Sequence, residues 1–115
     1  MSIGLSEFKR LALSFPGAEE QPHFSIPSFR FKTKIFATLW MKEKRAMVKL
    51  PIEEQSVFCS YDDSIFFPVS GAWGRQGATF VELKMVRKDM IKDALTVAYK
   101  AVAKEKPKST KRKKV

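Results

Sequence analysis

Three glycines at three-residue intervals constrain the fold of this chain more than any other feature of the sequence; they are Gly71, Gly74 and Gly77. The stretch reads SGAWGRQGATF over residues 70–80, and its larger side chains belong to Trp73, Arg75 and Gln76. Glycine tolerates positive φ angles and lets another backbone approach closely, so the spacing predicts a shaped loop with little helix or strand character. Such a loop can present an indole, a guanidinium and an amide to a base, a phosphate or a carboxylate. In a second interpretation it is a tight connection whose tryptophan fills the core.

The chain before this loop begins with a helical pattern and then becomes extended. Apolar residues at three- and four-residue steps predict an amphipathic helix over residues 5–15. A polar connection is expected over residues 19–21. Between residues 23 and 50 the period falls towards two, which predicts a meander of three strands with a hairpin tip at Thr33 and Lys34.

The second half of the chain repeats the mixture of helix and strand. A proline and two glutamates at its start predict a helix over residues 51–61. Strands are expected over residues 65–69 and 78–84, on either side of the glycine loop, and a final helix over residues 88–103. The order helix, three strands, helix, two strands, helix is typical of an α+β fold with helices packed on an antiparallel sheet.

Positive charge is concentrated at the C-terminal end of the chain. The net charge is +10, and residues 104–115 hold seven Lys or Arg and one Glu. A short basic run with Pro, Ser and Thr cannot bury apolar area, so it is expected to be disordered. We therefore predict one domain over residues 1–103 and a basic tail over residues 104–115. The tail either follows a polyanion or only keeps the chain soluble.

Several classes of protein are not indicated by the sequence. The single Cys59 excludes an internal disulfide framework. No apolar run approaches the roughly 18 residues of a membrane span, and no signal peptide is evident, so a cytoplasmic protein without membrane attachment is expected. No phosphate-binding or dinucleotide glycine motif occurs, and no ligand spacing suggests a metal, so we predict no catalytic residue, metal or cofactor. The sole histidine, His23, is the one candidate for a general base, which would need a neighbouring carboxylate.

Cations and aromatic residues are interleaved along the predicted strands and loop. Phosphate contacts need cations on a surface, and base contacts need exposed planar groups. We expect the cations to form one continuous patch beside the glycine loop. The residues predicted to contact nucleic acid are Arg30, Lys32, Lys34, Lys42, Lys44, Arg45, Lys49, Trp73, Arg75, Gln76, Lys111, Arg112, Lys113 and Lys114.

Four separated motifs occur together in a recognisable order. They are FPGAEEQPHFSIPSFRF (15–31), KIFATL (34–39), VKLP (48–51) and GAWGRQGAT (71–79). In this combination the chain resembles the MmcQ/YjbR family of small bacterial proteins over roughly residues 5–103. The positions that match the family pattern are His23, Pro27, Phe29, Arg30, Lys34, Phe36, Trp73, Gly74 and Gly77.

The resemblance implies a two-layer α+β fold of the kind called secretion-chaperone-like or CyaY-like. It also implies a DNA-binding role through paired wing-like hairpins, and it brings no catalytic residue with it.

Two hypotheses for function follow, and they need different geometry. The first is a non-enzymatic domain that binds nucleic acid, duplex DNA with weak sequence preference, which needs the cations on one exposed face. The second is a module that binds a small ligand or a protein partner in a pocket lined by His23, Trp73 and Arg75, which needs His23 and Trp73 close in space. The oligomeric state is left open.

Overall fold

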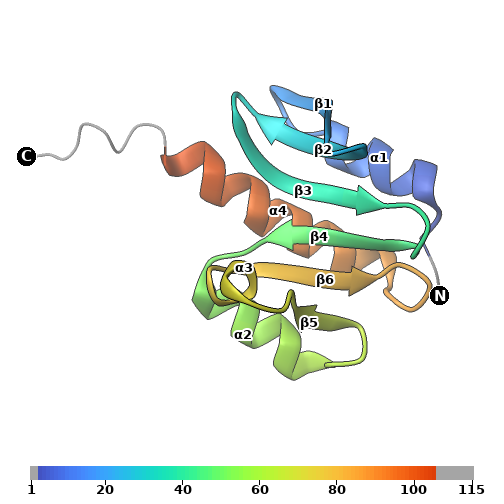
Figure 1. Cartoon of the computed structure of the whole chain (residues 1–115), viewed down its shortest axis with the longest axis vertical. Coiled ribbons are helices and arrows are strands. Elements are labelled where there is room, and N and C mark those ends of the chain that lie inside the picture. Colours follow the sequence, from blue (N-terminus) through green and yellow to red (C-terminus); the bar gives the residue numbers. More distant parts are fainter. Residues whose placement is uncertain (1–2, 106–115) are drawn as a thin grey trace, which may run out of the picture.

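The computed structural model describes residues 3–105, with side chains placed through residue 103. The strands in this part of the chain form one antiparallel sheet in the order β1-β2-β3-β4-β6-β5. They are β1 (Ala18–His23), β2 (Ile26–Phe31), β3 (Lys34–Trp40), β4 (Arg45–Lys49), β5 (Phe66–Pro68) and β6 (Ala78–Glu82). The helices are α1 (Leu5–Leu13), α2 (Ile52–Tyr61), α3 (Ala72–Arg75) and α4 (Lys88–Glu105). The predicted α+β class with an antiparallel sheet is confirmed (Figure 1).

Helices α1, α2 and α4 pack against one face of the sheet, and this face holds the core. Phe8 of α1 meets Phe29 of β2 edge to face, with ring centroids 5.7 Å apart. Tyr99 of α4 stacks on Phe15 at 4.7 Å and donates a hydrogen bond from its hydroxyl to a backbone carbonyl in the turn after α1. The apolar stripe of α4 is buried along its length; it consists of Ile91, Ala94, Leu95, Ala98 and Val102. Among the described helices, only the short α3 lies on the opposite face of the sheet, so most of that face has no helix over it.

The described part of the chain has one strand more than the sequence predicts. Residues 19–21 were expected as a polar connection, but they form the middle of β1 and pair with β2. This strand buries almost nothing of its own, so it has no alternating apolar pattern. It lies at the edge of the sheet, and its Pro22 sits opposite Pro27 of β2. Because an edge strand has no neighbour on its free side, a proline there costs the sheet no hydrogen bond.

The β2–β3 hairpin also differs from its expected register by one residue. Phe31 pairs with Lys34, so Lys32 and Thr33 form the tip in place of Thr33 and Lys34. Lys32 adopts a positive φ of 60°, which a two-residue hairpin turn requires at its first position.

A β-bulge in β3 decides which side chains reach the open face. Successive residues of β2 pair with Ala37 and then with Ile35, so Phe36 is an extra residue in the ladder. A bulge breaks the two-residue alternation. Phe36 therefore stays in the core with Ala37, while Ile35 and Thr38 both reach the open face, although they are three residues apart.

The last helix runs slightly past the predicted domain boundary at residue 103. Helix α4 continues to Glu105, two residues beyond its expected end. Of the predicted basic tail, residues 106–115 lie outside the described part of the chain. Within the described residues no helix is both long enough and apolar enough to cross a membrane.

Candidate binding groove on the open face of the sheet

The glycine loop forms a small platform above the open face, and part of it is helical. Residues Ala72–Arg75 form α3, which corrects the prediction of a loop with little helix character. Gly74 lies so close to the backbone of Val69 that a Cβ atom there would overlap the Val69 carbonyl oxygen. The helix is possible because this tight approach is made by a residue without a side chain.

Gln55 of α2 holds this platform from below. Its side chain is 8% exposed, and its Nε2 donates to the carbonyl oxygens of Gly74 and Ala78, at 2.9 and 3.2 Å. The same nitrogen lies 3.1 Å from the Thr79 hydroxyl oxygen, and that hydroxyl donates to the Gly77 carbonyl. One buried amide therefore ties α3, which carries Trp73, and the start of β6 to α2.

The β1–β2 hairpin forms the other side of the groove, and its turn is unusual. Phe24 and Ser25 make a two-residue turn with φ angles of 51° and 72°. Such turns normally contain Asn or Gly, because a bulky side chain at positive φ costs about 1–3 kcal/mol. Phe24 is nevertheless 87% exposed, so little packing in the described residues compensates for the strain. Its ring touches the imidazole of His23, with centroids 4.6 Å apart.

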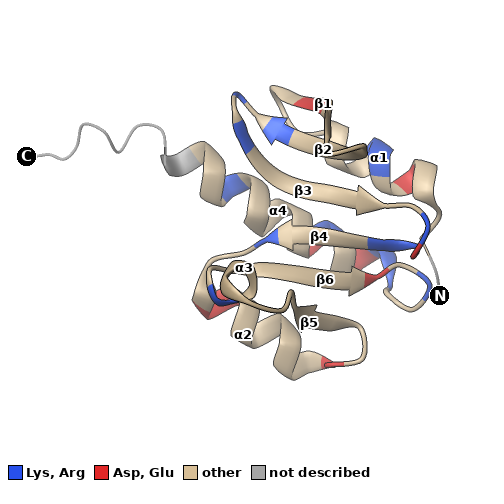
Figure 2. Cartoon of the chain, in the orientation of Figure 1, with Lys and Arg blue, Asp and Glu red and all other residues tan. Residues whose placement is uncertain are grey.

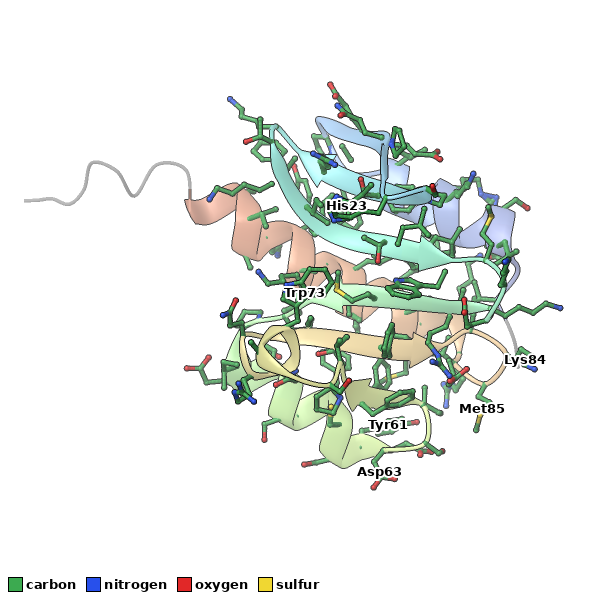
Figure 3. All side chains as sticks on the ribbon, in the orientation of Figure 1. His23, Tyr61, Asp63, Trp73, Lys84 and Met85 are labelled. Carbon is green, nitrogen blue, oxygen red and sulfur yellow. The ribbon has the colours of Figure 1, made fainter. Side chains whose placement is uncertain are left out.

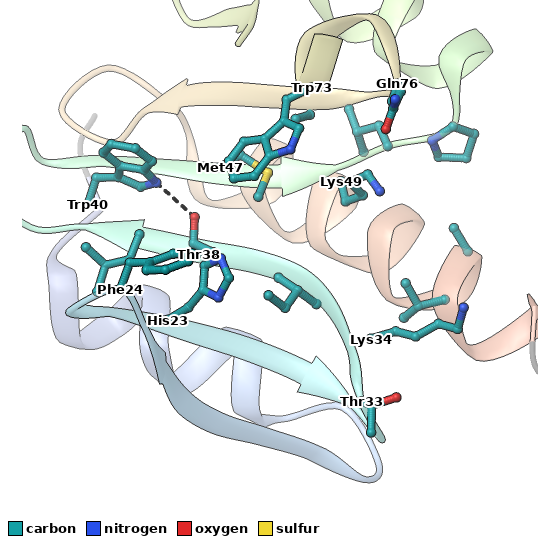
Figure 4. A pocket seen from close by; sticks show the side chains of 17 residues that line it. His23, Phe24, Thr33, Lys34, Thr38, Trp40, Met47, Lys49, Trp73 and Gln76 are labelled. Carbon is teal, nitrogen blue, oxygen red and sulfur yellow. Dashed lines mark hydrogen bonds between the residues drawn. The ribbon is translucent and has the colours of Figure 1, made fainter.

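A groove with a volume of about 740 Å³ runs between this hairpin and the α3 platform. His23 and Trp73 project into it from opposite sides, as Figures 3 and 4 show. Its floor is made by side chains of β3 and β4, including Thr38 and Met47. Trp40 donates a hydrogen bond from its indole Nε1 to the Thr38 hydroxyl at 2.9 Å, which fixes the indole at one end of the groove.

The groove has an aromatic end and a basic end. Trp40 and Phe24 lie at one end, and Lys34 and Lys49 lie at the other, beside Gln76 (Figure 4). The last described turn of α4 contributes Ala101 and Val102 near the basic end, just before the chain continues into residues 106–115. The described residues that line the groove include two lysines and no Asp or Glu.

The predicted cations do not form the single continuous patch that was expected. They fall into two groups at opposite ends of the sheet (Figure 2). One group surrounds the basic end of the groove and consists of Arg30, Lys32, Lys34 and Lys49; the other lies at the β3–β4 turn and consists of Lys42, Lys44 and Arg45. The predicted meander already implied this separation, because its successive turns lie at opposite ends of the strands, and the expectation of one patch did not take strand direction into account.

The two arginines among the predicted strand cations, Arg30 and Arg45, donate hydrogen bonds to partners within the described residues. The Arg45 guanidinium donates to one carboxylate oxygen of Glu82, at 2.9 Å from Nε and 2.5 Å from Nη2, and lies over the rings of Phe67 and Phe80. Arg30 donates from Nε to the Ser28 hydroxyl at 3.0 Å.

The other predicted site residues divide between the groove and the rest of the surface. His23 and Trp73 share the groove, as the pocket hypothesis requires, and Gln76 lines it too. Arg75 is exposed at the end of α3 and is not among the lining residues. The tail cations Lys111, Arg112, Lys113 and Lys114 lie outside the described residues.

Groups that could support catalysis are not gathered at the groove. Within residues 3–105, no carboxylate hydrogen-bonds to His23, whose neighbour is the Phe24 ring. Burial raises the pKa of the Cys59 thiol, and the nearby Asp63 carboxylate raises it further, so the thiolate is disfavoured. The described part of the chain contains no group of three or more His, Cys, Asp or Glu side chains that could hold a metal ion.

The structure adds groove residues that sequence reasoning did not select, chiefly Phe24, Thr38 and Met47. Thr38 reaches the groove because of the bulge, and no residue type in β3 predicts that bulge. Phe24 could have been noticed, because it stands between two prolines, Pro22 and Pro27, that are spaced as the arms of a tight hairpin.

Among comparisons with known proteins, one match was found, to a protein family. A protein-family model described as YjbR matches residues 13–101, which includes every described residue that lines the groove except Val102. Neither a curated protein nor a solved structure matches the chain.

Proposed function

The chain belongs to the YjbR family, and we propose that it is a non-enzymatic protein that binds nucleic acid in the groove on the open face of its sheet. The observation that carries this proposal is the composition of the groove. Among the described residues, four aromatic or imidazole rings line it together with two lysines, and no carboxylate does; the rings belong to His23, Phe24, Trp40 and Trp73. Cations attract the phosphate backbone, and planar side chains accept bases by stacking.

The charge around the groove favours a polyanion over a neutral partner. Lys49 is exposed at the end of β4, and within the described residues it has no ion-pair partner. Lys32 is exposed at the nearby hairpin tip. The sequence continues from this end of the molecule into residues 106–115, which hold six Lys or Arg and no Asp or Glu. Contacts of this kind supply affinity without reading sequence, which agrees with the weak preference predicted for duplex DNA.

Removing two exposed cations near the basic end of the groove, Lys32 and Lys49, is expected to reduce the salt dependence of binding. Each phosphate contact contributes about 0.9 to the slope of log K against log salt for duplex DNA. We expect Lys32→Asn combined with Lys49→Gln to make the slope shallower by about 1.8. Fluorescence anisotropy of a labelled DNA duplex between 50 and 200 mM salt, roughly the range over which such contacts are lost, measures this change.

The matched control removes the same charge far from the groove. Lys84→Gln combined with Lys92→Gln leaves the net charge equal to that of the first variant, and both lysines are exposed on other parts of the surface. We expect this variant to change the slope by less than about half as much. Equal slopes in the two variants would contradict a site at the groove and leave only general attraction of a basic protein to DNA.

A second candidate function rests on a separate observation, the convergence of His23 and Trp73 on one groove. A small anionic ligand with a planar group would fit the same rings and lysines. Detectable binding of such ligands, with no binding of DNA at 50 mM salt, would favour this alternative.

A further inference from the structure

We propose that the groove accepts unpaired nucleotides, so that the protein prefers a single strand to a duplex. This inference rests on the proposed function and specifies the form of nucleic acid. Three features support it: an aromatic side chain held out at the cost of backbone strain, further rings around the same groove, and a cation at the groove's far end.

The first feature is the turn at Phe24. A tight two-residue turn with positive φ at both positions is ordinarily made by small or amide residues, and here a phenylalanine occupies the first position at 51°. Its side chain is 87% exposed and projects at the rim of the groove. Strained backbone persists where the surrounding structure imposes it, and such positions cluster at functional sites. The turn therefore displays a flat apolar surface to solvent.

The second feature is that more planar groups surround the same space. Trp73 is 51% exposed on the α3 platform, and within the described residues its indole has no ring partner. His23 stands across the groove from it, against Phe24. In a duplex the faces of each base are covered by the bases above and below it. Side chains can stack on bases only where the bases are unstacked, as they are in single strands and loops.

The third feature is the position of the charge relative to the rings. Lys49 lies at the end of the groove away from Trp40 and Phe24, beyond Trp73 (Figure 4). A nucleotide has a planar base and an anionic phosphate at separate points, and the groove offers rings and a cation at separate points. In a strand the next phosphates would continue past Lys49 towards Lys32 at the hairpin tip.

The test compares three labelled ligands on the full chain at one salt concentration. They are a single-stranded oligothymidine of about twelve nucleotides, a duplex of equal length and mixed sequence, and thymidine monophosphate, whose binding is followed by competition. Stacking on one aromatic side chain changes affinity by roughly tenfold or more. We expect the single strand to bind at least about tenfold more tightly than the duplex, and the mononucleotide to bind more weakly than the strand.

The decisive variant replaces the strained turn with the pair that a tight hairpin prefers. Phe24→Asn combined with Ser25→Gly removes the exposed ring and relieves both positive-φ positions. We expect its melting temperature to rise by several degrees, because each relieved position adds stability. Its affinity for the single strand should fall by about tenfold, with duplex affinity unchanged. A ring with only a structural role would give no loss of affinity.

Two further variants distinguish stacking on the Phe24 ring from non-specific binding to exposed apolar side chains. Phe24→Tyr keeps an aromatic face and should bind the single strand as the parent does. Val57→Asn removes another exposed apolar side chain, which is 63% exposed on α2, and should leave affinity unchanged. Loss of affinity in the Val57 variant equal to that in the turn variant would overturn the inference.

The outcomes distinguish this inference from the function on which it rests. Equal affinity for strand and duplex, or preference for the duplex, overturns the single-strand inference and leaves nucleic-acid binding in place. Equal affinity for strand and mononucleotide shows that the site takes free nucleotides and also overturns it. If no ligand binds at low salt, the proposed function and the inference both fail.

Discussion

Replacing Gly77 with alanine is expected to remove a large part of the free energy of unfolding at 25 °C. The residue has a φ of +111°, and a Cβ atom there would overlap the carbonyl oxygen of Leu50. That oxygen belongs to a backbone segment tied to Gly77 by a hydrogen bond from the Leu50 N–H, at 2.9 Å, so neither chain can move aside alone. We expect a loss of at least about 4 kcal/mol from a total that is commonly about 5–15 kcal/mol. Denaturant unfolding followed by circular dichroism measures it.

The matched control is Gly71→Ala, which separates steric overlap from backbone strain. Gly71 also has a positive φ, of +85°, but nothing lies within 4 Å of the position of its Cβ. This variant should lose only the free energy that a positive φ angle costs an alanine, about 1–3 kcal/mol. A Gly77 variant that unfolds no more readily than the Gly71 variant would show that Leu50 can move away and that the close approach is not required.

Replacing Gln55 with glutamate is expected to make stability depend steeply on pH. The carboxylate would stand, almost fully buried, where the amide now donates to two carbonyl oxygens and a hydroxyl oxygen. An ionised acceptor among acceptors is disfavoured, so the folded state would hold the proton and the pKa of the new side chain would rise. Below the unfolded-state pKa, about 4.3, the group is protonated in both states and costs least. Above it, stability falls by up to about 1.4 kcal/mol for each pH unit until the folded state also ionises.

The measurement is the difference in unfolding free energy between variant and parent at several values of pH. We expect the Gln55→Glu variant to be several kcal/mol less stable than the parent at pH 7 and to recover much of this near pH 4. Gln55→Leu cannot titrate, so its loss, about 1–3 kcal/mol for unsatisfied acceptors, should not vary with pH. A flat difference for the glutamate variant would mean that the site admits water and that the amide does not hold the α3 platform rigidly.

The sequence predicted the layers of this fold because helices and buried strands leave periodic patterns. The stripe of α4 from Ile91 to Val102 repeats every three or four residues, and each of its apolar members is buried. Strand β1 left no such pattern, since it is stabilised by hydrogen bonds to β2 and not by burial of a face. The glycine loop was located correctly, but the short helix within it depends on two contacts that leave no periodic pattern in the sequence. They are the close approach of Gly74 to the Val69 backbone and the hydrogen bond from Gln55 to Gly74.

The groove was predicted only in part, for a related reason. His23 and Trp73 were proposed to lie close together, and both line the groove, from opposite sides. The expectation that the cations form one continuous patch was wrong. Lys34 begins β3 and Lys42 lies in the turn after it, a separation that follows from strand direction once Lys34–Trp40 is known to be one strand. The bulge at Phe36, which turns Thr38 into the groove, depends on pairing with β2 and leaves no local signal.

Both lateral borders of the sheet are poor templates for self-association. A border strand with free N–H and C=O groups can recruit a strand from another molecule and begin an aggregate. Here one border is β1, with two glutamates and Pro22, and the other is β5, a three-residue strand that ends in Pro68. Proline lacks the donor and the carboxylates repel a like neighbour, so neither border propagates the ladder readily. The protein can thus keep an aromatic, partly apolar face exposed to solvent while its sheet resists growth into fibres.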